Sequence, residues 1–471
     1  MKTLLPCSLA LILVGCTAYS PSSRIGTAQK DAPGRWSATP EARTGIDTNW
    51  VRRIAGGRGE SIVDEALSAN PDMRIAAERV NRAIASARTA GAALKPNLEA
   101  GLSGNRNKQN FVGFPSPFGG AIPPSTFDSY GANFTTTWEP DIWGFNRAGV
   151  AAQIAQAEME GQNYRAARAS LAAQTLRAWL AMGEANEKIA LAAESEQLLQ
   201  TTIDIVRDRF ESALVDEGGS ASQLRLAESR LASAKAVSAQ RKGEREQAVR
   251  QLELLMGRYP AGAFQGFHKL PEVPPMPPAG LPSELLLRRP DILAAERNFA
   301  STGSLLKQAT LAFYPSIKLT ASAGTSSGSL RDIVDSNFGI WSLGANLTQP
   351  IWRGGAIRSE KNRLKSEDRQ ALAQLQKTVL NAFGEVEQSL VADRFLAQRE
   401  AAVANALSSS QKAATAAYDD YAGGTGDALM LINAQQNRID LAAQLVTLRR
   451  LRLDNRITFH LALGGDYRVG K

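Results

Sequence analysis

The sequence repeats itself once, at a spacing far longer than that of a solenoid repeat. Pro71 and Pro290 stand in the similar segments LSANPDMRIAAERV and LLRRPDILAAERNF and lie 219 residues apart. Trp143 and Trp352, in EPDIWG and TQPIWRG, lie 209 residues apart. Because such landmarks keep their order while the offset drifts slowly, the chain is predicted to be an internal duplication. Each half is then a whole structural unit, and the two halves are expected to pair.

Each half is expected to contain the same succession of elements. The predicted helices are a leading helix (61–95; 282–313), a very long helical stretch (144–212; 353–422) and a returning helix (220–257; 427–463). Two alternating stretches lie between the first and second of these. At 1.5 Å per residue, about 65–70 helical residues reach roughly 100 Å. Apolar residues at three- and four-residue spacing in the long stretches predict narrow coiled-coil seams.

The boundaries of the predicted segments follow from this pattern. They are a signal peptide (1–15), an N-terminal tether or equatorial segment (16–60), a first repeat (61–257), an inter-repeat linker (258–281), a second repeat (282–464) and a tail (465–471). The tether is rich in Gly, Pro, Ser and Thr, and the linker contains PEVPPMPP, which excludes a helix there.

Strict alternation of apolar and polar residues marks the predicted strands. It runs through 130–139, 316–324 and 341–348, and more weakly through 98–102. Alternation over roughly ten residues is typical of a transmembrane β-strand, although a soluble sheet with one wet face shows it too. Four tryptophans are expected at the membrane interfaces; they are Trp138, Trp143, Trp341 and Trp352.

Four strands cannot close a barrel, and an open sheet edge is not tolerated in lipid. Several chains must therefore share one barrel. Two chains give eight strands and a filled interior, whereas three give twelve and leave room for a pore. A trimer is expected if a pore is intended, with 105–128 and 325–337 as external loops.

The N-terminus reads as a secretory signal with a lipid attachment site. A basic start at Lys2 precedes the apolar run 4–14, which is too short to span a bilayer as a permanent helix. Leu13-Val14-Gly15-Cys16 resembles the bacterial lipobox, so Cys16 is predicted to be lipidated and to become the first mature residue. An ordinary signal peptide with an incidental cysteine is the alternative. By resemblance to bacterial lipoproteins, Thr17 directs the anchor to the outer membrane.

These residues together resemble the outer-membrane factor family, the TolC-like channels of tripartite efflux pumps, and within it the NodT-type lipoprotein branch. The matching segments are RPDI with AAE at 289–296, YPSI at 314–317, WEPDIWG at 138–144 and PIWRGG at 350–355. The resemblance implies a fold of mixed α and transmembrane β structure. A homotrimer would form a 12-stranded outer-membrane β-barrel continued by a long α-helical periplasmic barrel. The resemblance also implies two partners: a periplasmic membrane-fusion adaptor and an inner-membrane RND-type transporter.

The resemblance places the periplasmic gate at the two turns of the long hairpins. The candidate gate and tip residues are Arg209, Asp216, Tyr421, Gly424, Thr425, Asp427 and Asn433. The family usually has Leu-Asp-Ala-Gln where this chain has Ile-Asn-Ala-Gln at 432–435, so Asn433 replaces an acidic residue and Asp427 is the nearby carboxylate. We expect contacts of Arg209 or Tyr421 with carboxylates to hold the closed state.

Composition excludes most other functions. The chain has two His and two Cys, and its net charge of +8 comes from interleaved charges rather than a basic patch, so we expect no metal site, no cofactor and no nucleic acid. The G-x-S-x-G at 324–328 ends a strand at a loop and lacks partners for a triad, so no enzyme is expected. The prediction is a passive trimeric exit duct for drugs or other small molecules. A duct for type I protein secretion and a lipid-anchored periplasmic coiled-coil scaffold are the alternatives.

Overall fold

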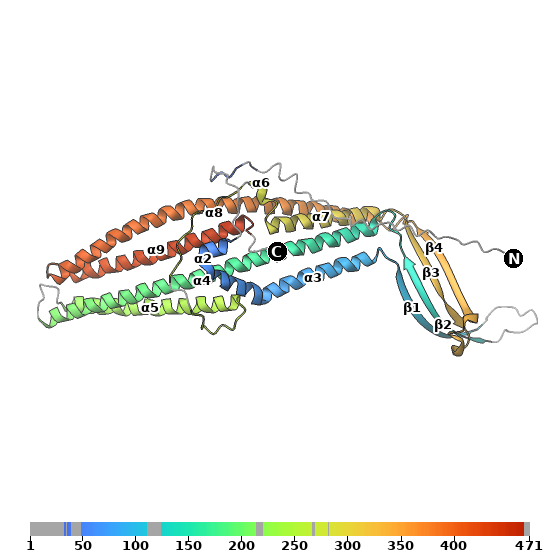
Figure 1. Cartoon of the computed structure of the whole chain (residues 1–471), viewed down its shortest axis with the longest axis horizontal. Helices are drawn as coiled ribbons and strands as arrows, with labels where there is room; N and C mark the ends of the chain where they lie inside the picture. Colours follow the sequence, from blue (N-terminus) through green and yellow to red (C-terminus); the bar gives the residue numbers. More distant parts are fainter. Residues whose placement is uncertain are drawn as a thin grey trace, which may run out of the picture. The chain divides into compact units, whose positions relative to one another are not determined.

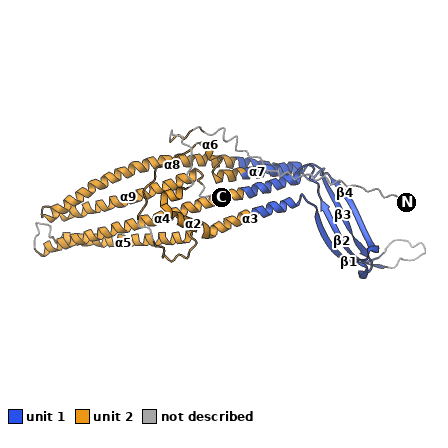
Figure 2. Ribbon diagram, in the orientation of Figure 1, with its two compact units in different colours: residues 1–23, 82–158, 297–372 blue, residues 24–81, 159–296, 373–471 orange. Residues whose placement is uncertain are grey.

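The structure is a computed structural model that describes residues 33, 35–38, 49–110, 124–212, 220–265, 269–280 and 282–465. They fall into two compact units (Figure 2). Among the described residues, a sheet unit comprises those within 82–158 and 297–372, and a helical unit comprises those within 24–81, 159–296 and 373–471. The predicted lipidation site, Cys16, and the tip residue Asp216 lie outside the described residues.

The sheet unit contains one four-stranded antiparallel sheet, in which the strands lie side by side in sequence order (Figure 1). The strands are β1 (Asn97–Gln109), β2 (Ser125–Trp138), β3 (Ser316–Ser327) and β4 (Gly339–Thr348). All four predicted strands are present. β1 and β2 are longer than expected, since they take in both ends of the predicted loop 105–128. The short 3₁₀ helices η2 (Leu330–Asp332) and η3 (Ser336–Phe338) connect β3 to β4.

The strand register gives the sheet two faces of different chemistry. In one row Ala100 pairs with Phe134, Phe134 with Ala323, and Ala323 with Trp341. Since side chains alternate across a strand, the apolar residues share this face; they are Leu98, Ala100, Leu102, Tyr130, Ala132, Phe134, Trp138, Ile317, Leu319, Ala321, Ala323, Trp341, Leu343, Ala345 and Leu347. The opposite face carries mostly Ser, Thr, Asn and Gly, with Glu99 and Lys318 as its charged residues within the strands.

The helices follow the predicted duplication closely. They are α2 (Trp50–Ala69), α3 (Pro71–Ala92), α4 (Phe145–Glu211), α5 (Ala221–Leu255), α6 (Pro282–Leu285), α7 (Pro290–Leu311), α8 (Ala356–Ala422) and α9 (Ala428–Ala462). The long stretches and the returning helices match their predicted bounds to within three residues. Within the described part, no helix combines the length and the apolar character needed to cross a membrane.

The leading helix of each half differs from the prediction. Each is broken immediately before a proline, into α2 and α3 in the first half and into α6 and α7 in the second. A residue that precedes proline is pushed out of the helical region, which explains the break at Asn70, where ψ is 128°. The first helix also begins at Trp50, inside the segment expected to be an extended tether, and it is kinked at Gly56, where φ is +67°.

The breaks are the sites of a contact that the duplication has kept in both halves of the helical unit. The Asn70 side chain donates to the carbonyl oxygen of Leu255 at 2.9 Å, and Arg289 donates to that of Ala462 at 3.1 Å. The donors are 219 residues apart, as Pro71 and Pro290 are, and the acceptors are 207 residues apart. The two returning helices thus end against the two proline breaks in the same way, with different side chains supplying the donor.

The main core of the helical unit joins α2, α4, α5 and α9. Its largest side chains include Trp50, Trp179, Leu252 and Ile457, all fully or almost fully buried. Leu270, from the inter-repeat linker, packs into the same cluster. Where it is described, the linker forms no helix, as predicted.

A buried carboxylate fixes the start of this linker. Glu253 of α5 accepts hydrogen bonds from the backbone N–H groups of Gly262, Ala263 and Phe264 at 2.7–2.9 Å. Burial raises the pKa of this carboxyl, but the three donors outweigh burial and the pKa lies below its ordinary value. The carboxylate therefore stabilises the fold at pH values above about 4.3, the ordinary pKa of Glu.

We predict that Glu253→Gln lowers the thermal unfolding temperature at pH 7. Between pH 7 and pH 3, the unfolding temperature of this variant should also decrease less than that of the wild type. The wild-type protein loses this contribution as the pH falls through the lowered folded-state pKa, whereas the amide has no proton to gain. Melting curves of the purified protein from pH 3 to pH 7 measure the effect. Glu246→Gln, a partly exposed carboxylate on the same helix, is the matched control. Equal curves for Glu253→Gln and wild type would contradict the role of Glu253.

Candidate functional site

The turn between α8 and α9 is a compact loop closed by its own backbone. The N–H groups of Thr425 and Gly426 both donate to the carbonyl oxygen of Asp420, at 3.0 and 2.9 Å. Gly424 has a φ of +81°, which a residue with a side chain adopts only at a cost. The Thr425 hydroxyl also donates to the Asp420 carbonyl. The predicted tip residues Gly424 and Thr425 therefore shape the turn, and nothing in their contacts requires a ligand.

Arg209, in the last turn of α4, ties this helix to the end of α8. Its guanidinium donates to the main-chain carbonyl oxygen of Tyr421 and lies over the Tyr421 ring, 4.3 Å from the ring centre. Both side chains are buried, with Arg209 7% exposed and Tyr421 0% exposed. Val206, Ala417, Ala428 and Leu431 pack around the Tyr421 ring in one apolar cluster. Since α4 and α8 belong to different hairpins, this contact joins the two hairpins at their tips.

A second contact joins the beginnings of the returning helices. The Gln223 side-chain amide donates to the carboxylate of Asp427 at 3.1 Å. Gln223 also forms a capping box with Ser220 at the start of α5. Sequence reasoning did not select Gln223, although S-x-x-Q before a helical run is a recognisable capping-box pattern. Asp427, in turn, is the N-cap residue of α9 and is exposed.

The predicted gate residues are therefore brought together only in part. Arg209, Tyr421 and Asp427 lie within one cluster: burial raises the pKa of the Tyr421 phenol, Arg209 opposes that rise, and Asp427 adds to it. Asn433 lies six residues into α9, exposed to solvent. The expected contacts of Arg209 or Tyr421 with carboxylates stay a prediction; the Tyr421 contact of Arg209 is to a main-chain carbonyl and an aromatic ring.

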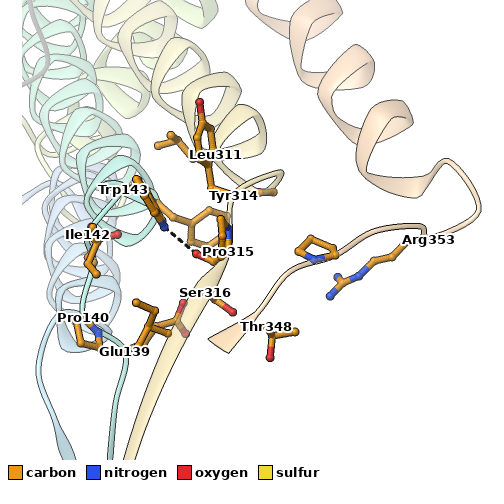
Figure 3. A pocket seen from close by; sticks show the side chains of 15 residues that line it. Glu139, Pro140, Ile142, Trp143, Leu311, Tyr314, Pro315, Ser316, Thr348 and Arg353 are labelled. Atoms are coloured by element: carbon orange, nitrogen blue, oxygen red, sulfur yellow. Dashed lines mark hydrogen bonds between the residues drawn. The ribbon is translucent and has the colours of Figure 1, made fainter. Parts of the chain in front are cut away.

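The four predicted interface tryptophans lie in three settings within the sheet unit. Trp138 ends β2 at the helical end of the apolar face, and Trp341, the third residue of β4, lies in the row of Phe134, four residues farther along β2. Trp352 follows β4 and is highly exposed. Trp143 lies outside the strands; its indole donates to the carbonyl oxygen of Pro315 at 2.8 Å and packs against Tyr314 (Figure 3).

Trp143 and Tyr314 line a pocket of about 240 Å³ at the end of the sheet where the helices begin (Figure 3). Asp141, also in its wall, accepts from the backbone N–H groups of Asn146 and Arg147 and so caps the first turn of α4. The lining comes from both halves of the duplication, from the WEPDIWG and YPSI segments of the sequence. These segments therefore have a structural role, since they join strands to helices.

The described residues give no support for catalytic chemistry. The G-x-S-x-G segment ends β3 and leads into η2, a three-residue 3₁₀ turn, instead of the long helix that a nucleophile elbow needs. No three His, Cys, Asp or Glu side chains are grouped to hold a metal ion in the described ranges.

Comparison with known proteins identifies the family. The family model of the outer membrane efflux protein matches residues 62–258 and 281–465. The chain belongs to the outer membrane efflux protein family. The two matched ranges correspond closely to the two predicted repeats, and together they cover most of the chain.

Relatives match over nearly the whole length of the efflux protein. The pyoverdine export outer membrane protein OpmQ of Pseudomonas aeruginosa is 29% identical, with 99% of this chain and 97% of OpmQ covered. The probable outer membrane lipoprotein SilC of Salmonella typhimurium is 26% identical, with 98% of each chain covered. The Campylobacter jejuni CmeC outer membrane channel has the same fold, with a TM-score of 0.85, 23% identity and 93% and 92% of the two chains covered.

These findings confirm the predicted family, the fold class and the assignment to efflux across the outer membrane. The protein is a channel component and not an enzyme, as expected.

Proposed function

We propose that this efflux protein works as a trimeric passive duct, through which drugs or other small molecules leave the cell. The observation that carries the proposal is the two-faced sheet. One face is apolar across all four strands and suits contact with lipid, and the other is rich in hydroxyl and amide groups and suits a wet lumen. β1 and β4 each have one neighbouring strand in the sheet, so further copies of the chain can pair at both edges.

The gate is proposed at the hairpin tips, where Arg209 with Tyr421 and Gln223 with Asp427 join neighbouring helices. Around a three-fold axis, each exposed Asp427 would occur three times, and such a ring favours cations. Asp216 and Asn433 remain candidates for the same rim. The four interface tryptophans would sit at the two membrane boundaries.

A periplasmic adaptor and an inner-membrane RND-type transporter are the proposed partners, since the family's relatives are named as the outer-membrane parts of pumps. The transporter would supply the energy, because the chain carries no nucleotide-binding motif. A type I secretion duct shares this architecture and is the second candidate.

Single-channel recording in planar bilayers tests the proposal. The purified full-length protein is expected to form discrete conductance steps, whereas a lipid-anchored coiled-coil scaffold would give none. Cross-linking of the protein in its native membrane is expected to stop at three copies. The absence of conductance steps from a cross-linked trimer would contradict the duct.

We further propose that Cys16 anchors the mature chain by lipid. The lipobox-like segment supports this, as does the name of SilC, a probable outer membrane lipoprotein. Cys16→Ser is predicted to abolish incorporation of radiolabelled palmitate and to leave the protein at its unprocessed length. Cys7→Ser is the matched control, because that cysteine lies within the predicted signal peptide. Undiminished labelling of Cys16→Ser would exclude this anchor.

A further inference from the structure

The apolar face of the sheet changes character along β1, its first strand. From the helical end outward, Leu98, Ala100 and Leu102 are apolar, Gly104 follows, and Arg106 and Lys108 stand next on the same face. Their common face follows from the register, in which Leu102 pairs with Ala132 and Arg106 with Asp128. Two basic side chains therefore continue the apolar surface at the end of the sheet that is away from the helices.

The distance along the sheet places this pair at a membrane boundary. Trp138, at the helical end of the same face, lies ten residues along β2 from Asp128, the partner of Arg106. Ten residues at about 3.4 Å each, in a strand tilted by about 40°, cover roughly 25 Å of membrane thickness. That is the height of the apolar band of an outer-membrane protein. If Trp138 lies at the inner boundary, Arg106 and Lys108 lie at the outer one.

Both basic groups are available to a ligand. The Arg106 side chain is 75% exposed, and its Nε lies 3.5 Å from the Asp128 carboxylate, a distance longer than that of a direct hydrogen bond. Within the described residues Lys108 forms no ion pair. Asp128 offsets one of the two positive charges, and the connecting residues 110–124 add no further acidic residue. Residues two apart on a strand are about 7 Å apart, so both can reach one phosphorylated headgroup.

We propose that Arg106 and Lys108 bind the phosphate groups of an anionic lipid in the outer leaflet of the outer membrane. Arginine offers paired donors to a phosphate, and lysine adds a compact positive charge. Their alkyl stems extend along the apolar face while the charged ends reach the headgroup layer. This inference rests on the proposed function, since it requires the apolar face to contact lipid.

Native mass spectrometry of the full-length protein tests the proposal, with bisphosphorylated lipid A and its dephosphorylated form as probes. The variant Arg106→Gln/Lys108→Gln is expected to bind the bisphosphorylated lipid about tenfold more weakly than wild type does. Both proteins should bind the dephosphorylated lipid equally. Lys318→Gln removes a lysine from the opposite face of the same sheet and should change neither affinity. An excess of inorganic phosphate should not displace the lipid.

Equal affinity of the double variant and wild type for the phosphorylated lipid would overturn the proposal, as would an equal loss in Lys318→Gln. Displacement by inorganic phosphate would assign the site to a free anion and overturn it too. Bilayer recordings of the same preparations keep the two proposals apart. A conducting protein with unchanged lipid affinity contradicts the lipid site alone, whereas a wild type that never conducts contradicts the duct.

Discussion

Asp393→Asn is expected to destabilise the helical unit by about 3–5 kcal/mol, because it leaves a buried arginine without its counter-ion. Arg456 of α9 is 2% exposed, and its Nη1 lies 2.5 Å from the Asp393 carboxylate of α8. Its Nε donates to the carbonyl oxygen of Pro274 in the inter-repeat linker at 3.0 Å. The pair thus joins two long helices and the linker at one point.

The large effect arises from the asymmetry of a buried pair. Removing one partner leaves the other charge buried and unpaired, whereas replacing both by apolar side chains can leave the stability unchanged. We therefore expect the double variant Asp393→Leu/Arg456→Met to recover most of the loss. Arg452 lies 3.9 Å from the same carboxylate and pairs more closely with Glu400, at 2.7 Å, so Arg456 is the main partner of Asp393.

Thermal unfolding of the purified protein, followed by circular dichroism, measures these differences. Glu360→Gln is the matched control, because Glu360 and Arg363 form an exposed pair on the same helix, α8. It should leave the unfolding temperature unchanged, since exposed pairs contribute little. An unfolding temperature of Asp393→Asn no lower than that of Glu360→Gln would show that the buried ion pair does not stabilise the protein.

The helices and strands could be predicted from the sequence because residue spacing and alternation depend only on neighbouring residues. Residue spacing located the ends of α4, α5, α8 and α9 to within three residues. Alternation predicted the apolar face of the sheet, and the register confirms it across all four strands. The helix breaks at Asn70 and Arg289 could also have been predicted, since each residue precedes a proline. Pro71 and Pro290 served above only as markers of the duplication and not as helix boundaries.

The contacts between helices could not be predicted in this way, because they join residues far apart in the sequence. The run RRLRLDNR at 449–456 contains four arginines, and periodicity does not say which of them is buried. Arg456 is buried because Asp393 and Pro274 come to it from segments far away in the sequence. Similarly, Arg209 was predicted as a tip residue, but one of its partners, the main-chain carbonyl of Tyr421, leaves no trace in the sequence.

Arg209→Ala is expected to open the proposed duct. The substitution removes the hydrogen bond to the Tyr421 carbonyl and the stacking on its ring, a combined loss of about 2–3 kcal/mol for a charged donor in a buried place. If these contacts exist only while the tips are closed, a loss of about 2 kcal/mol shifts the ratio of open to closed channels about 30-fold. Single-channel recordings should then show a much larger open fraction than in wild type.

Two further variants separate gating by this contact from general damage at the tip. Tyr421→Phe keeps the backbone carbonyl and the aromatic face, and its hydroxyl has no hydrogen-bond partner in the part of the chain described, so the open fraction should stay near that of wild type. Arg207→Ala removes a half-exposed arginine of α4. Its ion pair with Glu228 is long, at 3.8 Å, so this variant should also behave like wild type. Arg209→Lys should keep the channel closed only in part, since an ammonium lacks the planar face that lies over the Tyr421 ring. An open fraction that rises equally in Arg207→Ala and Arg209→Ala would show that any loss of positive charge opens the tip, and that the Tyr421 contact is not the latch.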